Sequence, residues 1–415
     1  MKLPTMLCRL PVLASLGLVS ALAQPSITVT SPPDGVTATA PAVWELAVAA
    51  VEDGSPVVQV EYFADGTRVA VATNAPFAVT LNPAPVGGYA LRARVTDALA
   101  RTADSAPVHV SVARATSAPL TLQIFHASDL EAGIPALTDA LNFSRVLNGL
   151  RAGTTLPTLT LSSGDNYIPG PFFTASADPA AGYNGVKGRG DIALCNALGF
   201  QAAAAGNHEF DDNTPQFASM LRADAAVGYP GTLFPYLSAN LDWNSDASTR
   251  GLIIADGADW RAGSNRVAHA CTITVEGQII GIVGATTVEL RQISSPGTLV
   301  VKTNLAAKVQ PAVDHLLALG CNKVVLIAHL QQYANEFTLA TQLRDVDVIV
   351  AGGSHAIFAA PGNRLRAGHT AAEAYPVAFT SPVGEPVFVV NAGSNFEYVG
   401  RLIVSFDEAG RRPHV

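Results

Sequence analysis

The stretch AAAAGNHEFDD, residues 202–212, joins a run of small apolar residues directly to a run of polar ones. A strand buried on both faces explains the apolar half, because such strands appear as continuous apolar runs. Four other buried-strand patterns end in the same way, with carboxylate, amide or imidazole side chains directly after them. Between the strand patterns, residues 138–150, 217–221 and 306–319 carry apolar residues at helical spacing. This alternation predicts an α/β layered domain with polar groups gathered at the carboxyl ends of its strands.

Residues 25–113 have a different pattern, with short alternating runs such as SITVT and VVQVEYFADG separated by turn residues. Short strands at this spacing predict an antiparallel β-sandwich. The order VEYFADGTRVA, APFAVTL and YALRARVTDA resembles bacterial immunoglobulin-like modules. No cluster of ligand-type residues occurs there, so we expect a spacer or adhesion module. The predicted fold is therefore multidomain: an all-β immunoglobulin-like sandwich at 25–113, then an α/β domain at 120–408.

Residues 1–23 have the pattern of a secretory signal peptide. Lys2 and Arg9 precede an apolar stretch that ends in the small-x-small sequence Ala21-Leu22-Ala23. A membrane anchor is the alternative, but the stretch is short for a span of about 20 residues. No later segment predicts a membrane span. We therefore expect a periplasmic or secreted protein.

Charge and cysteine content exclude some classes of partner and site. The net charge of −8 is spread thinly, without a basic stripe, so a duplex nucleic acid partner is not expected. Cys8 lies within the predicted signal, and no cysteine spacing suits a zinc site. We expect Cys195, Cys271 and Cys321 to be buried free thiols, with one disulfide and one unpaired thiol as the alternative. The sequence does not indicate an oligomeric state.

The polar residues after the strand patterns are of the types that bind metal ions. They are Asp129, Glu131, Asp165, Asn166, Asn207, His208, Glu209, Asp211, His329 and His355. Buried carboxylates repel one another, so they need a compensating positive charge. A mixed oxygen and nitrogen set suits Zn²⁺, Mn²⁺ or iron better than Mg²⁺ alone, and Ca²⁺ is a further candidate. We expect two divalent ions about 3.5–4 Å apart that share a bridging carboxylate. Asp165 is the expected bridge, because the glycine before it allows close backbone approach.

The motif order D-x-H/E, G-D, G-N-H-E, H and G-x-H resembles the calcineurin-like metallophosphoesterases. GNHEFD and the later FEYVGRLIVSFD are similar to their 5'-nucleotidase-type branch in particular. The resemblance spans about residues 120–407 and implies a four-layer αββα domain. It also implies that Asp129 and Asp165 bind the first ion. The second ion would then take Asp165, Asn207 and His329.

The resemblance also implies roles for the rest of the GNHEFDD segment. His208 would face the substrate and stabilise or protonate the leaving oxygen. Asp211, three residues further on, would orient His208 if a helix begins here. Glu209 is expected to have a structural capping role.

Two positions depart from the family pattern. The family usually has histidine where this chain has Glu131, which adds negative charge. Its last motif usually reads G-H-x-H, so Gly353 stands where a ligand to the second ion is expected. His355 either keeps the role of the second histidine or moves into the vacancy. The other motif residues are present, which favours an active enzyme over a decayed site.

The 5'-nucleotidase branch also has a C-terminal domain that stacks the base and binds the phosphate. We expect no such domain within this sequence, and this weakens an inference of nucleotide specificity. Inserts at residues 169–189 and 244–265 are the alternative source of cleft residues. Candidates in and beside these inserts are Tyr167, Phe172, Phe173, Trp243, Trp260 and Arg261, and the alternative for each is a surface-loop residue without a role in binding.

The function expected from this resemblance is hydrolysis of a phosphomonoester by direct attack of a hydroxide that bridges the two ions. The substrate would be a small phosphorylated molecule, with nucleotides as one class. No G-x-S-x-G elbow or P-loop motif occurs, which argues against serine hydrolases and nucleoside triphosphatases. One alternative is a phosphodiesterase acting on cyclic nucleotides or nucleotide sugars. The other is a non-catalytic exported binding protein with a degenerate metal site.

Overall fold

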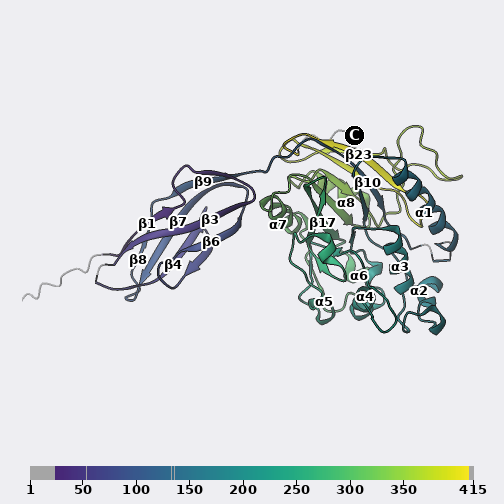
Figure 1. The fold of residues 1–415 in the computed structure, drawn as a ribbon, viewed down its shortest axis with the longest axis horizontal. Coiled ribbons are helices and arrows are strands. Elements are labelled where there is room, and N and C mark those ends of the chain that lie inside the picture. The colour runs from purple at the N-terminus through teal and green to yellow at the C-terminus, as the bar shows by residue number, and fades with distance from the viewer. Residues whose placement is uncertain (1–23, 53, 132, 135, 411–415) are drawn as a thin grey trace, which may run out of the picture. The chain divides into compact units, whose positions relative to one another are not determined.

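The computed structural model describes residues 24–410 except 53, 132 and 135 (Figure 1). The predicted signal peptide, residues 1–23, lies outside the described residues. The chain forms two compact units, and each is described by itself. Within the described ranges, none of the helices has the length and apolar character needed to cross a membrane.

The N-terminal unit is all β, as expected. One sheet has the order β1-β3-β6 and the other the order β2-β9-β7-β4-β5, with β8 paired to β7. Buried and exposed residues alternate along β3, where Trp44 and Leu46 point inward. The strands are β1 (Ser26–Ser31), β2 (Thr37–Thr39), β3 (Ala42–Val51), β4 (Val57–Ala64), β5 (Thr67–Ala72), β6 (Val79–Ala84), β7 (Gly87–Asp97), β8 (Thr102–Asp104) and β9 (Val108–Ala113).

The second unit contains two six-stranded sheets. The first has the order β15-β13-β12-β11-β10-β23, parallel except for the edge strand β23. Its strands are β10 (Leu120–Ala127), β11 (Thr158–Ser162), β12 (Ala202–Ala204), β13 (Tyr236–Leu237), β15 (Val267–Ala268) and β23 (Gly400–Phe406). Parallel strands place their carboxyl ends at one edge of a sheet, so the segments after β10, β11 and β12 lie near one another.

The second sheet has the order β16-β17-β19-β20-β22-β21. Its central strands are parallel, and both edge strands pair in the antiparallel direction. The strands are β16 (Ala270–Val275), β17 (Gln278–Thr286), β19 (Val324–His329), β20 (Val348–Val350), β21 (Val377–Thr380) and β22 (Pro386–Val390). Their near-continuous burial is typical of parallel strands that are covered on both faces.

The two sheets pack face to face, and helices cover their outer faces, which confirms the four-layer αββα order. Ala202 and Ala204 of β12 face the second sheet, whereas Ala203 and Ala205 face the helices. Because these side chains are small, both layers pack closely on this strand. On the first sheet lie α1 (Ala136–Ala152), α3 (Arg189–Leu198) and α4 (Asn213–Leu221), and on the second α7 (Leu305–Ala318) and α8 (Tyr333–Ala340).

The connecting segments contain shorter elements. They are α2 (Pro171–Ala175), η1 (Pro179–Ala181), η2 (His208–Phe210), β14 (Leu241–Asp242), α5 (Ala247–Arg250), η3 (Trp260–Gly263), α6 (Leu290–Ile293) and β18 (Val300–Val301). Cys195, Cys271 and Cys321 are free and buried, as expected.

Candidate metal centre

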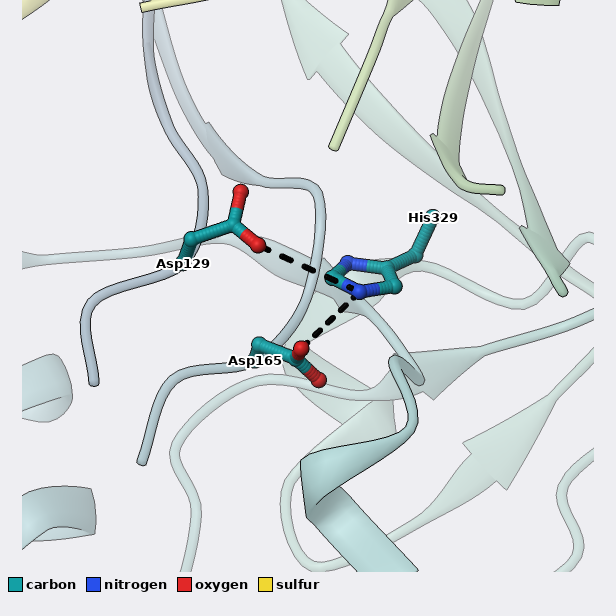
Figure 2. Close-up of side chains that lie close together, drawn as sticks. All are labelled: Asp129, Asp165 and His329. Atoms are coloured by element: carbon teal, nitrogen blue, oxygen red, sulfur yellow. Dashed lines mark ion pairs between the residues drawn. The ribbon is translucent and has the colours of Figure 1, made fainter. Parts of the chain in front are cut away.

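The carboxyl ends of four strands converge at one point of the second unit. Asp129 follows β10, Asp165 follows β11, Asn207 follows β12, and His329 ends β19. Figure 2 shows the side chains of Asp129, Asp165 and His329 pointing toward one another. Asp129 and Asp165 have φ angles of 53° and 50°. Residues with a Cβ seldom adopt this left-handed region, and such outliers gather at functional sites.

His329 is at the centre of this group. Its Nε2 lies 2.9 Å from Oδ2 of Asp165, 3.2 Å from Oδ1 of Asn207 and 4.0 Å from Oδ1 of Asp129. Its Nδ1 lies 2.8 Å from the carbonyl oxygen of Ser163. That second contact fixes the ring orientation, so Nε2 faces the carboxylates.

A second group of donors lies on the other side of Asp129 and Asp165. Nε2 of His355 is 2.8 Å from Oε1 of Glu131 and 3.6 Å from Oδ1 of Asp129. Oε2 of Glu131 is 3.3 Å from Nε2 of His208. Asp165 offers a ligand atom to both groups, with Asp129 and His329 in one and with Glu131 and His208 in the other. This shared position is the one a bridging carboxylate requires.

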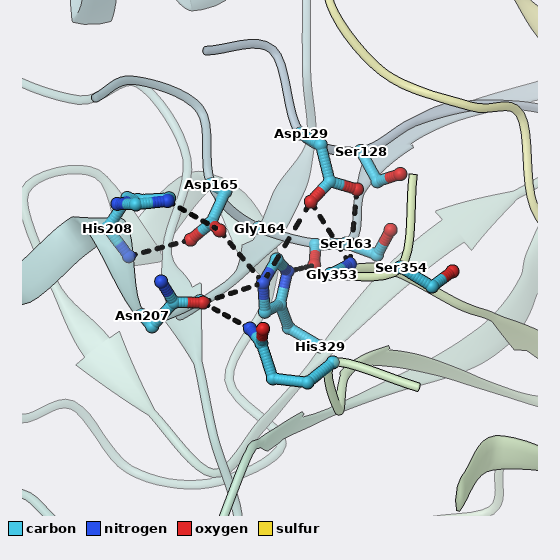
Figure 3. Close-up of polar contacts among 12 residues, drawn as sticks. Ser128, Asp129, Ser163, Gly164, Asp165, Asn207, His208, His329, Gly353 and Ser354 are labelled. Atoms are coloured by element: carbon cyan, nitrogen blue, oxygen red, sulfur yellow. Dashed lines mark hydrogen bonds and ion pairs between the residues drawn. The ribbon is translucent and has the colours of Figure 1, made fainter. Parts of the chain in front are cut away.

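His208 lies at the more accessible side of the centre, with a quarter of its side chain exposed. Its backbone N–H donates to Oδ1 of Asp165 at 2.8 Å, and its Nδ1 is hydrogen-bonded to Oδ2 of Asp211. The short η2 turn makes this i,i+3 contact possible. Burial lowers the pKa of His208, but the nearby carboxylates outweigh it and raise the pKa to about 9. Figure 3 shows the polar contacts that run from His208 through Asp165 and His329 to Asp129.

Glu209 connects the two loops that carry the ligands. Its carboxylate accepts hydrogen bonds from the N–H groups of Gly206 at 2.7 Å, Asp165 at 3.0 Å and Asn166 at 3.0 Å. This is the structural role expected for Glu209. A Cβ at residue 206 would lie 2.2 Å from Oδ1 of Asp165, so only glycine fits there.

The donor set fits a divalent cation. Asp129, Asp165 and His329 are almost completely buried. Burial raises the pKa of Asp129 to about 6. Burial lowers the pKa of His329, but Asp165 and Asp129 outweigh it and raise that pKa to about 10. The buried carboxylates therefore favour a positive charge at this point, which either a proton on His329 or a bound cation can supply.

Glu131 supports the same conclusion. Its Oε2 is buried and lies 3.3 Å from Nε2 of His208, but it accepts no hydrogen bond from any described residue. Metal–ligand distances are about 2.0–2.2 Å, so two neighbouring ligands of one ion lie about 3 Å or slightly more from each other. The separations between donor atoms at this centre are of that size.

Comparison with known proteins agrees with this architecture. Residues 25–124 match the family model described as a bacterial Ig domain. The 5'-nucleotidase of Bos taurus is 30% identical over 308 residues, which cover 70% of this chain and 48% of that protein. The structure of a 5'-nucleotidase precursor from Thermus thermophilus is 28% identical with a TM-score of 0.55, covering 71% of this chain and 53% of that one.

The structure of the NAD nucleotidase of Haemophilus influenzae is 27% identical with a TM-score of 0.56. The match covers 72% of this chain and 51% of that one. The second unit is a 5'-nucleotidase-like domain. Both resemblances expected from the sequence are thus confirmed. The chain spans about half the length of the relatives that it matches.

The 5'-nucleotidase-like domain places both unusual residues at the centre. Glu131 contacts two imidazoles there, those of His208 and His355. Gly353 contributes its backbone, because its N–H lies 3.1 Å from each carboxylate oxygen of Asp129. The polar contacts of His355 are with Asp129 and Glu131.

One residue at the centre was not anticipated from the sequence. Gln331 lies two positions after His329, and its Nε2 donates a hydrogen bond to Oδ1 of Asn207. The second glutamine of the IAHLQQ motif, Gln332, is exposed. The IAHLQQ motif contains both glutamines, but the sequence did not show which of the two side chains turns toward the site.

For three of the aromatic residues, the prediction that they line the cleft is wrong. Tyr167, Phe173 and Trp243 are each 2% exposed and belong to the core between the first sheet and its helices. Buried rings of this kind cannot stack on a ligand. Arg261 is well exposed and lies over the ring of Trp260, 5.3 Å from its centroid.

Proposed function

We propose that this protein is an exported, metal-dependent hydrolase that removes phosphate from a small phosphorylated molecule, of which nucleotides are the favoured class. The observation that carries the proposal is the convergence of Asp129, Asp165, Asn207 and His329 from four strands, with His208 at the accessible side. The names of the similar proteins favour a nucleotide substrate. We retain the predicted boundaries: a signal at 1–23, the immunoglobulin-like module at 25–113 and the hydrolase domain at 120–408.

We divide these donors between two positions for divalent ions, and we assign Asp129, which lies near both His329 and His355, to the position with Glu131. Asp129, Glu131 and His355 would hold one ion, Asn207 and His329 would hold the other, and Asp165 would contact both. Divalent ions held there supply charge that stabilises a phosphoryl transition state and acidifies water. The candidate ions are Zn²⁺, Mn²⁺, iron and Ca²⁺.

His208 is the residue we assign to the substrate's phosphoryl or leaving oxygen. Asp211 holds its Nδ1, so its Nε2 faces the centre and is able to donate a hydrogen bond. Asp211 is itself positioned by Ser294, whose Oγ donates to Oδ1 of Asp211 at 2.8 Å. His208 is therefore the catalytic residue, and Asp211 is its positioning residue.

Two serines near the centre, Ser128 and Ser163, are not suited to nucleophilic attack. Oγ of Ser163 donates to the carbonyl of Ala351 at 2.9 Å, and Oγ of Ser128 donates to the carbonyl of Gly393 at 3.1 Å. Both are buried and neither has a histidine base within hydrogen-bond reach among the contacts of the described residues. This supports direct attack by water over a covalent intermediate.

A second candidate is cleavage of a phosphodiester or pyrophosphate link, in cyclic nucleotides, nucleotide sugars or dinucleotides. The similarity to a protein named NAD nucleotidase favours it. Turnover of p-nitrophenyl phosphate, bis-p-nitrophenyl phosphate, AMP and NAD should be compared with Mn²⁺, Zn²⁺ and Ca²⁺. We expect monoester turnover that His208→Ala abolishes. A chain inactive on every substrate with every metal would leave only the binding role.

The export proposal has its own test. Expression in a bacterial host followed by fractionation should release a product that begins near Gln24 into the periplasm or medium. Mass spectrometry of that product would identify the cleavage point. A cytoplasmic product that retains Met1 would contradict export.

A further inference from the structure

Residue 353 cannot supply a side-chain ligand to the centre. Gly353 has a φ of 85°, in the region that favours glycine. A Cβ there would lie 2.9 Å from Nε2 of His329 and 2.8 Å from the backbone nitrogen of Gln331. The next residue, Ser354, accepts a hydrogen bond from Nδ2 of Asn391 at 3.0 Å. Neither Gly353 nor Ser354 therefore supplies a side-chain ligand to the side of the centre formed by Asn207 and His329.

Gln331 occupies the space on that side. Its side-chain amide contacts Oδ1 of Asn207, which lies 3.2 Å from Nε2 of His329. That Nε2 lies in turn 2.9 Å from Oδ2 of Asp165. The amide of Gln331 is thus the next polar group in a continuous series of ligand-type atoms.

The backbone around Gln331 holds it in an unusual conformation. Its φ of 69° lies in the left-handed region, which residues with a Cβ seldom adopt. The turn is closed by the N–H of Gln332, which donates to the carbonyl of Leu330 at 2.8 Å. The buried carboxylate of Glu336 accepts the N–H of Leu330 at 3.2 Å. These contacts keep the turn beside β19, where Gln331 reaches Asn207.

A cation would change which end of the Gln331 amide faces the centre. In the structure the amide nitrogen of Gln331 donates to the side-chain oxygen of Asn207. Rotation of the amide by a half-turn places its oxygen there instead, since the two ends are nearly equal in size. Two amide oxygens side by side repel each other unless a cation lies between them. Amide and carboxylate oxygens are suitable ligands for divalent ions.

We infer that Gln331 is a ligand of the second ion, through its side-chain oxygen, and completes the position formed by Asp165, Asn207 and His329. The inference rests on the proposed metal-dependent function. It also makes the two positions chemically unequal. Asp129 and Glu131 add negative charge to the first, whereas Asn207 and Gln331 add none to the second. The second ion is expected to bind less tightly.

The test is metal binding by the full chain, independent of turnover. Chains freed of metal are titrated with Zn²⁺ or Mn²⁺ by isothermal calorimetry, and bound metal is counted by elemental analysis after dialysis. We expect two ions for the wild type. Gln331→Ala should keep the tighter ion and lose about tenfold or more in affinity for the other. Gln331→Glu, which retains an oxygen ligand, should bind two.

The neighbouring residue is the matched control. Gln332 is exposed, so Gln332→Ala should bind both ions like the wild type. Circular dichroism of the metal-free chains should show the same fold for all variants. If Gln331→Ala binds the second ion as tightly as the wild type, the role of Gln331 is wrong while the proposed function stands. A wild-type chain that binds no ion would overturn both.

Discussion

Nε2 of His208 lies 3.3 Å from Oε2 of Glu131. The same carboxylate contacts Nε2 of His355 through its other oxygen, at 2.8 Å. A residue that replaces the family's usual histidine thus connects the candidate catalytic imidazole with a candidate metal ligand. The replacement adds negative charge to the proposed first metal position, which histidine would not.

Replacing Glu131 by glutamine should weaken the first metal position. Glu131→Gln keeps the shape of the side chain and removes its charge, so we expect the affinity for the first ion to fall about 10- to 100-fold. Calorimetric titration with Mn²⁺ measures this. Glu276 is exposed and provides the matched control, Glu276→Gln, which should bind like the wild type. Equal affinities for both variants would show that Glu131 is not a ligand.

His208 and Asp211 should affect turnover without affecting metal content. We expect His208→Ala to lower kcat by about 10²- to 10⁴-fold, as for other general acids. Asp211→Asn should lower kcat less, because Asp211 acts only through the orientation of His208. The neighbouring Asp212 pairs with Lys187 at 2.9 Å, so Asp212→Asn is the control. Loss of bound metal in His208→Ala would instead assign His208 to the ligand set.

Gly206 should not tolerate any side chain. In Gly206→Ala the new Cβ would overlap Oδ1 of Asp165 at 2.2 Å, which forces the bridging carboxylate to move. We expect a destabilisation of about 1–3 kcal/mol in thermal or denaturant unfolding and a loss of bound metal. Gly149 of α1 has no atom within 4 Å of its added Cβ, so Gly149→Ala should be neutral or stabilising. A fully metallated Gly206→Ala chain would contradict the close approach at this loop.

A buried carboxyl group far from the metal centre should make stability depend on pH. Burial raises the pKa of Asp347 to about 8, and its carboxylate accepts the N–H of Val324 at 2.7 Å. The folded chain therefore holds a proton that the unfolded chain releases near pH 4. The protonated carboxyl group of Asp347 contributes fully to the free energy of unfolding below about pH 4. This contribution is lost as pH rises through about 8.

Asp347→Asn imitates the protonated form and should remove this dependence. Its melting temperature relative to the wild type should rise between pH 5 and pH 9. Asp314 is about half exposed, and Asp314→Asn is the control that should show no such trend. The opposite trend for Asp347→Asn would mean that the Asp347 carboxylate is ionised in the folded chain.

The sequence determined which residue types reach the centre and from which strands. Asp129, Asp165 and Asn207 each follow an apolar run, and the parallel strands of one sheet bring such ends to one edge. His329 ends a strand of the other sheet, so its approach to them depends on how the two sheets pack. The sequence also predicted a close backbone approach at Gly164, the residue before Asp165, because glycine has no side chain. These features depend on neighbours along the chain, so a single sequence is sufficient to predict them.

Only the tertiary structure decided how the side chains are paired. Glu131 lies between two imidazoles, Gln331 rather than Gln332 faces Asn207, and Tyr167 and Trp243 lie in the core. Each of these outcomes depends on contacts between segments far apart in the chain. Burial and pairing arise when the layers pack, and no local periodicity contains that information.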